Sequence, residues 1–259
     1  MGKNEFVKIV VVISANIEWK AIRLQHPHVF IQHSPFGEWF IDSLEIPSYA
    51  SNTSTESHEE LEIIPEINSG HNERVIFFHG GWGKISAAAS TQYIINRWSP
   101  DLLVNLGTCG GFQGEIERGT IILVEKTIVY DLIEQMADHD ETILYYTTDI
   151  DLSWLGSDFP HEVRQSLLVS GDRDLVVDEI SILRAEYGAI AGDWESGAIA
   201  FVSALNNQRL LILRGVSDLV SEQGGEAYGN IRHFEEATTV ILKKLVTALP
   251  EWIRISNVF

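Results

Sequence analysis

The 259-residue sequence predicts an α/β fold of three layers, with a mostly parallel or mixed central sheet and helices on both faces. Apolar β-branched runs alternate with helical patterns along the chain, which is typical of a sheet made by strand–helix units. Runs such as 7–14 and 210–213 contain almost no polar residue, as expected for strands buried on both faces. A hydrophobic content of 45% at this length suits one domain over residues 1–259.

The first half of the chain is predicted to begin with a strand at 7–14, followed by a turn into a helix at 15–22. Residues 47–72 are rich in Ser, Asn, Thr, Glu and His, which predicts a surface excursion with a candidate edge strand at 61–67. The other elements expected here are strands at 29–39 (with a turn at 35–37), 75–78 and 102–105, and a helix at 84–98.

In the second half, two stretches fit more than one element. Residues 145–155 are ambiguous. Residues 163–168 suit the end of a helix, whereas residues 167–169 suit the start of a strand, and the two alternatives overlap. The remaining elements expected here are strands at 119–125, 127–130, 189–191 and 210–213, and helices at 180–187, 196–205 and 231–249.

Composition limits the partners that this chain is expected to have. The formal net charge is −19 and would repel a phosphate backbone, so nucleic acid polymers are disfavoured while a small nucleoside is not. The single cysteine, Cys109, excludes an internal disulfide and favours a reducing cytoplasm. The apolar run at 9–13 is too short for a signal sequence or a membrane span. No metal-ligand cluster or cofactor fingerprint is expected.

Three carboxylates are the strongest chemical candidates. Glu18 follows the first strand, Glu195 opens the helix at 196–205, and Asp218 follows the strand at 210–213. Acids at the carboxyl ends of parallel strands can meet over one crevice. There one acid can bind a sugar hydroxyl while another protonates a leaving group. The competing interpretation is that each carboxylate only caps or neutralises a helix N-terminus.

Two glycine-rich segments also follow predicted strands. One is Gly107-Thr108-Cys109-Gly110-Gly111, and the other spans residues 79–84. Glycines let backbone N–H groups approach a ligand, although a compact turn without a ligand fits equally well. Neither segment has P-loop or dinucleotide spacing. These two segments, residues 170–172, Glu18 and Asp218 each follow a predicted strand. Five strand ends thus carry polar or glycine-rich residues, which predicts a ligand crevice along one edge of the sheet.

The ordered set of motifs resembles the nucleoside phosphorylase-I superfamily, and within it the methylthioadenosine/S-adenosylhomocysteine nucleosidases. The resemblance spans residues 7–22 and 75 to the C-terminal helix. The motifs that carry it are Gly81-Trp82-Gly83-Lys84, Asn105-Leu106-Gly107-Thr108-Cys109-Gly110-Gly111, Ser170-Gly171-Asp172, Asp193-Trp194-Glu195 and Arg214-Gly215-Val216-Ser217-Asp218.

This resemblance implies hydrolysis of the N-glycosidic bond of a purine nucleoside. It implies that Asp218 protonates or hydrogen-bonds N7 of the base, that Glu195 binds the ribose hydroxyls and that Glu18 activates water. Breaking the bond leaves positive charge on the ribose and negative charge on the purine, which suits these assignments. Substrate-binding positions are implied at Thr108, Cys109, Gly110, Leu175, Asp193, Trp194, Arg214 and Ser217.

The sequence departs from the family pattern at two places. Phosphorylases of the superfamily commonly carry an arginine where this chain has Asn105, which favours water over phosphate as nucleophile, with Arg23 as the remaining candidate for phosphate. The nucleosidases usually have an aromatic residue shortly after Ser-Gly-Asp to stack on adenine. Here the segment continues as Arg173-Asp174-Leu175, so either Trp194 stacks on the base or the substrate differs.

Two alternatives therefore remain open beside hydrolysis. One is a phosphate-dependent purine nucleoside phosphorylase, and the other is a nucleoside-binding protein of the same fold without turnover. The presence of all three acids favours an enzyme. The resemblance also implies a homodimer or higher homo-oligomer, with Trp82, Phe112 and Tyr130 as candidates for a two-fold contact.

Overall fold

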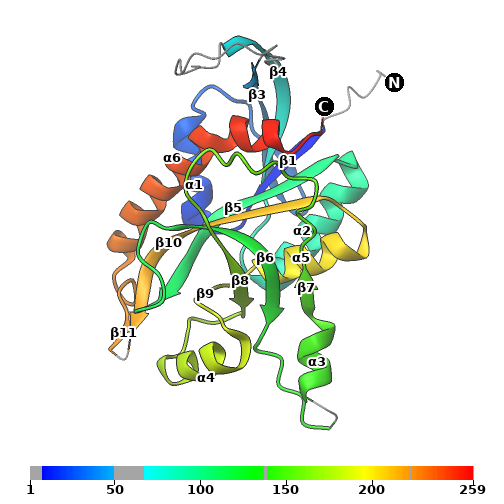
Figure 1. Ribbon diagram of the computed structural model, residues 1–259. Coiled ribbons are helices and arrows are strands. Elements are labelled where there is room, and N and C mark those ends of the chain that lie inside the picture. The colour runs from blue at the N-terminus through cyan, green and yellow to red at the C-terminus, as the bar shows by residue number, and fades with distance from the viewer. Residues whose placement is uncertain (1–7, 50–66, 137–138, 222, 259) are drawn as a thin grey trace, which may run out of the picture.

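The computed structural model describes residues 8–49, 67–136, 139–221 and 223–258. A central sheet lies between two pairs of helices (Figure 1). The helices α1 (Asn16–Gln25) and α6 (Ile231–Ile255) cover one face, and α2 (Gly83–Trp98) and α5 (Ser196–Leu205) cover the other. The three-layer α/β architecture predicted from the sequence is confirmed. Two further helices, α3 (His139–Tyr145) and α4 (Val177–Tyr187), lie at the lower end of the view in Figure 1.

The sheet is mixed, with parallel strands at its centre. Strand β1 (Ile9–Ile13) runs parallel to both β4 (Ile67–His79) and β5 (Leu102–Phe112), and β5 runs parallel to β10 (Leu210–Ser221). On one side, antiparallel pairing adds β3 (Gly37–Tyr49) and then β2 (Gln32–Ser34).

On the other side of β1 the strand pairings close on themselves. Strand β10 pairs with β6 (Ile121–Val129), β6 with β8 (Arg164–Ser170), β8 with β9 (Ala191–Asp193), and β9 returns to β5. Two short strands pair antiparallel with members of this group: β7 (Thr147–Asp149) with β6, and β11 (Gly224–Gly225) with β10. This closure brings β5, β9 and β10, which carry many of the candidate motifs, close to one another.

The apolar core lies on both faces of the sheet because alternate residues of each strand point to opposite sides. In β1, Ile9 and Val11 pack in the cluster that contains α1 and α6, while Val10 and Val12 pack in the cluster that contains α2 and α5. This is the physical reason why the run had no polar residue: neither face of β1 meets water.

Several elements differ from the sequence-based expectation. The glycine segment 107–111 is not a loop but the second half of β5, and the alternative of a helix end at 163–168 is wrong because β8 occupies 164–170. Residues 47–49 and 67–72 of the predicted surface excursion lie in β3 and β4, and its residues 50–66 lie outside the described residues. The candidate edge strand at 61–67 lies almost wholly outside the described residues.

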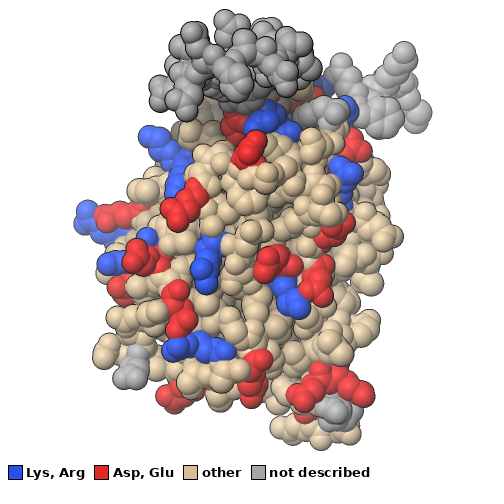
Figure 2. Space-filling view, viewed as in Figure 1, with Lys and Arg blue, Asp and Glu red and all other residues tan. Residues whose placement is uncertain are grey.

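On the face shown in Figure 2, acidic and basic side chains are interspersed rather than gathered into fields of one sign. Across the described residues, no helix combines the length and apolarity that crossing a bilayer requires.

Candidate active site

One cavity collects side chains from both halves of the chain. It has a volume of about 500 Å³, within the range of small-molecule sites. Its wall comes from the start of α1, the turn before α2, β5, the β8–α4 connection, the β9–α5 connection, β10 and the segment before α6. Glu18, Glu195 and Asp218 all line it, and they are 3%, 6% and 5% exposed. The structure therefore places the three candidate acids around one space.

Glu18 is held by both of its carboxylate oxygens. Oε1 accepts hydrogen bonds from the Thr108 backbone N–H at 2.6 Å and the Thr108 hydroxyl at 2.9 Å. Oε2 accepts from the Ala15 N–H at 3.1 Å, which is the reciprocal half of a capping box. The helix-capping interpretation is thus correct for one oxygen, while the other fixes the carboxylate against β5.

A β-bulge positions Asp218. Val216 pairs with Cys109 and Asp218 pairs with Gly110, so Ser217 is an extra residue in β10. Bulges re-aim the side chains beside them, and here Asp218 lines the cavity. Its carboxylate accepts from the Ser217 hydroxyl at 2.7 Å. Burial nevertheless raises the pKa of Asp218. Asp218 lies inside a strand, so it does not cap the next element.

Glu195 also does not act as the cap that its position suggested. Its Oε1 accepts from the Gly83 N–H at the start of α2, at 3.0 Å. Asp193 caps α5 instead, because Oδ2 of Asp193 accepts from the Ser196 N–H at 3.1 Å. Burial, and next the negative charge of Asp193, raise the pKa of Glu195 to about 8.

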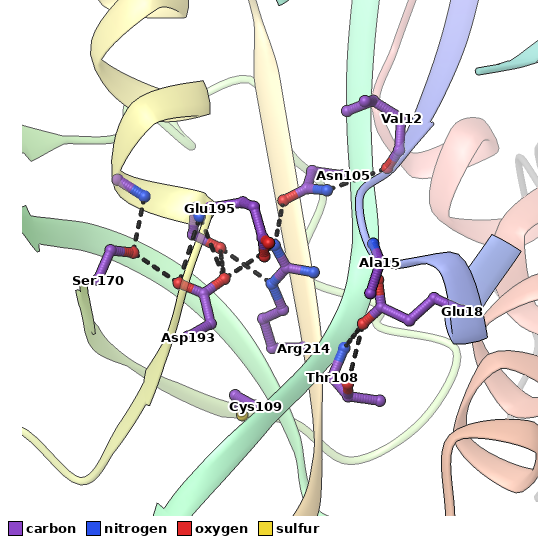
Figure 3. A network of polar contacts seen from close by, with 12 residues as sticks. Val12, Ala15, Glu18, Asn105, Thr108, Cys109, Ser170, Asp193, Glu195 and Arg214 are labelled. Carbon is purple, nitrogen blue, oxygen red and sulfur yellow. Dashed lines mark hydrogen bonds and ion pairs between the residues drawn. The ribbon is translucent and has the colours of Figure 1, made fainter. Parts of the chain in front are cut away.

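Arg214 lies at the centre of a buried polar network (Figure 3). Its Nη2 is 2.8 Å from Asp193 Oδ2 and donates to Asn105 Oδ1 at 2.7 Å, and its Nε donates to the Ser196 hydroxyl at 2.9 Å. Within the described part of the chain, Nη1 has no hydrogen-bond partner. It lies beside Gly107, where a Cβ would be 1.7 Å from it and 2.8 Å from Glu18 Oε1. The absence of a side chain at Gly107 therefore makes room for the guanidinium next to Glu18.

The other predicted site residues fall into two groups. Most of them line the cavity: Thr108, Cys109, Gly110, Leu175, Asp193, Trp194 and Ser217. Arg214 lies beneath the wall instead, and the Asp193 carboxylate is already bonded to Ser170, Ser196 and Arg214. These two residues hold one another and the start of α5 in place.

Three expectations about other residues are not met. Arg23 lies 3.7 Å from Glu38 in an ion pair and does not line the cavity, so it is not placed to hold phosphate there. Phe112 is fully buried and Tyr130 is 8% exposed, which leaves neither available for a two-fold contact. Trp82, at 63% exposure, remains available.

The structure adds residues that sequence reasoning did not assign to the site. The Trp82 ring stacks on Trp194 with centroids 5.1 Å apart, and both rings line the cavity. Tyr228 lines it from the segment before α6. Lys84 bonds to Asp131, and the Lys84 N–H donates to Asp172 at 2.7 Å, which ties down the start of α2. The aromatic residues Trp82 and Tyr228 within glycine-rich segments were the available sequence signal.

The arrangement has the parts that acid–base chemistry at a polar ligand requires. A desolvated carboxyl with a raised pKa, Asp218, can hold a proton for donation. Glu18 and Glu195 present carboxylate oxygens to the same cavity. Trp82, Trp194, Leu175 and Tyr228 supply apolar surface around them.

Comparison with known proteins gives consistent results. The family model described as "Phosphorylase superfamily" matches residues 44–249. A 5′-methylthioadenosine/S-adenosylhomocysteine nucleosidase of Hydrogenovibrio crunogenus is 27% identical over 190 residues, which cover 68% of this chain and 81% of that protein. The nucleosidase of the same name from Buchnera aphidicola is 30% identical over 161 residues, covering 56% of this chain and 67% of that protein.

Solved structures share the fold over nearly the whole chain. The Campylobacter jejuni 5′-methylthioadenosine/S-adenosylhomocysteine nucleosidase matches with a TM-score of 0.69 and 15% identity, covering 96% of this chain and 99% of the other. The Helicobacter pylori nucleosidase, solved with butyl-thio-DADMe-Immucillin-A, also has a TM-score of 0.69, with 14% identity and coverage of 96% and 100%.

Proposed function

Because the chain belongs to the phosphorylase superfamily, we propose that it is a purine nucleosidase. Its reaction is hydrolysis of the N-glycosidic bond of an adenosine-type thionucleoside, such as methylthioadenosine or S-adenosylhomocysteine, to free base and sugar. Relatives that carry the name of this activity support the substrate class. The observation that carries the proposal is that Glu18, Glu195 and Asp218 line one cavity.

The proposed roles follow from the surroundings of each acid. Asp218 donates a proton to N7 of the leaving base, and burial raises its pKa in the direction that this role needs. Glu195 holds the ribose hydroxyls and, when ionised, faces the positive charge that develops on the sugar. Glu18 takes the proton of the attacking water, while the Thr108 N–H and hydroxyl fix its carboxylate.

The other predicted residues shape the site around these acids. The base is proposed to bind near Asp218 and Ser217. The cavity wall there is formed by Cys109, Gly110 and Leu175. Trp194 provides the surface under the ribose. Arg214 turns Nη1 toward the Glu18 side of the site, and Asp193 fixes the guanidinium from the opposite side (Figure 3). Together these contacts orient the sugar and the water.

Water is favoured over phosphate as the nucleophile. The place where phosphorylases commonly carry an arginine is occupied by Asn105, whose amide donates to the Val12 carbonyl at 3.0 Å and whose oxygen accepts from Arg214. Asn105 adds no positive charge for a phosphate, and Arg23 is paired with Glu38 away from the cavity. The presence of all three acids argues against a binding protein without turnover.

We also propose that the protein assembles with copies of itself. Large apolar side chains are exposed in and around α2, α3 and α5: Trp82 before α2, Ile85 on α2, Tyr145 on α3 and Leu205 on α5. Such surface is typical of subunit contacts. Light scattering during size-exclusion chromatography tests this, with a mass of at least two chains expected. A cytoplasmic location is part of the same proposal, supported by the single free cysteine.

Chromatography of the reaction products tests the function. Methylthioadenosine, S-adenosylhomocysteine, adenosine, inosine and guanosine are each incubated with the protein, with and without phosphate. We expect release of adenine from the two thionucleosides without phosphate. Release that depends on phosphate would support the phosphorylase alternative, and release from none of the five would contradict the proposal.

A further inference from the structure

The connection between β8 and α4 has no aromatic residue at the place where the nucleosidases usually have one to stack on adenine. Arg173 lies over the Tyr130 ring, 5.4 Å from its centroid, and bonds to Glu179. Asp174 is exposed and has no apolar face. Leu175 is buried and packs against the backbone of Gly110 and Gly192. Arg173, Asp174 and Leu175 line the cavity from this connection, and none of them offers an aromatic ring to a base.

Tyr228 is an aromatic ring of the cavity wall that belongs to the surroundings of Asp218. The neighbouring Ala227 N–H faces the Asp218 carboxylate and partly offsets the rise that burial causes in its pKa. The Tyr228 hydroxyl donates to the Leu175 carbonyl at 2.8 Å. Tyr228 therefore lies next to both Leu175 and the segment that contacts Asp218, the residue proposed to protonate the base, whereas Trp82 and Trp194 stack on each other beside Glu195.

The Tyr228 ring is fixed in place but not covered. It packs on the backbone of Gly225, where a Cβ would come within 2.5 Å of the ring. At the same time 41% of the residue is exposed, and the ring lines the cavity. Burial raises the pKa of Tyr228 above its ordinary value, so the hydroxyl stays protonated and serves as a donor to Leu175. The part left for a ligand is the ring itself.

We propose that Tyr228 supplies the aromatic surface against which the substrate's base lies, so that it is a base-binding residue of the cavity. This inference rests on the proposed nucleosidase function. A ring held at its hydroxyl and against Gly225 loses little freedom when a base binds, which favours stacking. Stacking is sequence-tolerant because every base has a π face, so Asp218 rather than Tyr228 would read the identity of the base.

Two substitutions separate the ring from its hydrogen bond. Tyr228→Phe keeps the ring and removes the bond to Leu175, whereas Tyr228→Leu removes both. Calorimetry of wild type and both variants measures binding of two fragments, adenine and methylthioribose. Losing one stacking surface should weaken adenine binding by Tyr228→Leu at least about 5-fold. We expect Tyr228→Phe to stay within about 3-fold of wild type, and methylthioribose binding to be unchanged in both variants.

Steady-state kinetics give a second readout. Tyr228→Leu should raise the KM for methylthioadenosine more than it lowers kcat. Equal losses of adenine binding in Tyr228→Phe and Tyr228→Leu would assign Tyr228 a structural tie and overturn the inference. Unchanged adenine binding in Tyr228→Leu would overturn it too. If wild-type protein binds and cleaves neither methylthioadenosine nor adenosine, the proposed function itself fails and the inference falls with it.

Discussion

Arg214 and Asp193 form a buried ion pair, with Nη2 and Oδ2 2.8 Å apart and both side chains at most 3% exposed. The pair joins β10 to the end of β9, and Asp193 also caps α5. It therefore holds the backbone on both sides of Glu195. Nη1 of Arg214 also lies beside Gly107, next to the Glu18 carboxylate. The glycine at 107 is what allows the guanidinium to reach this place.

Removing one partner of this pair should destabilise the whole protein. In Asp193→Ala, the Arg214 charge stays buried without its counterion, and such losses typically cost about 3–5 kcal/mol. Urea unfolding followed by circular dichroism measures the change in the free energy of unfolding. A loss below about 1 kcal/mol would show that water or another group takes the place of the carboxylate.

Gly107→Ala should abolish activity, because the added Cβ would come within 1.7 Å of Arg214 Nη1 and 2.8 Å of Glu18 Oε1. Gly156→Ala is the matched control, since its Cβ would meet only contacts of 3.4 Å or more. The measurement is kcat/KM for methylthioadenosine, with the melting temperature recorded for both variants. Full activity in Gly107→Ala would mean that the network tolerates displacement of Arg214.

Asp218→Asn should lower kcat at least about 10²-fold, as expected when a positioned general acid is lost. The amide keeps the shape of the side chain, so substrate binding should change much less than turnover. Stopped assays of adenine release, with the KM measured in parallel, test this. Normal kcat in Asp218→Asn would show that a different group protonates the base.

The stability of the empty protein should fall as pH rises from about 5 to 8. Glu195 ionises near 4.5 when unfolded but near 8 when folded, so over this interval the folded state keeps a proton that the unfolded state has lost. Stability contributed in this way is present below pH 4.5 and is lost toward pH 8. Thermal melts at stepped pH measure the slope.

Glu195→Gln should make that slope shallower, because glutamine does not titrate. Asp218, whose pKa is also raised, would keep part of the dependence. The same variant should lose at least about 10²-fold in kcat. An unchanged slope in Glu195→Gln would place the titration on another group.

The sequence predicted the layers of the fold because its apolar runs have no polar interruptions. Strand β1 is the clearest case, with all five residues buried. The same logic failed for β5, because glycines read as a loop although residues 107–111 continue the strand. Those positions are glycine because of what packs on them, and Arg214 is more than one hundred residues away along the chain.

The candidate acids were found because they follow strands, and strand ends meet in a parallel sheet. What each acid touches was not predictable, since Glu195 takes its hydrogen bond from Gly83, 112 residues away. Tyr228 was not predicted as a site residue for a related reason. Its segment is rich in Gly and Glu and resembles a solvated loop until the Ala227–Asp218 and Tyr228–Leu175 contacts are seen.

The most direct test of the account is the origin of the oxygen that the sugar gains. Methylthioadenosine is cleaved in isotopically labelled water, with inorganic phosphate also present, and the sugar product is weighed by mass spectrometry. Attack by water activated at Glu18 predicts free methylthioribose that carries one labelled oxygen, and Glu18→Gln should form almost none of it. An unlabelled sugar phosphate, or labelled product formed at the normal rate by Glu18→Gln, would contradict it.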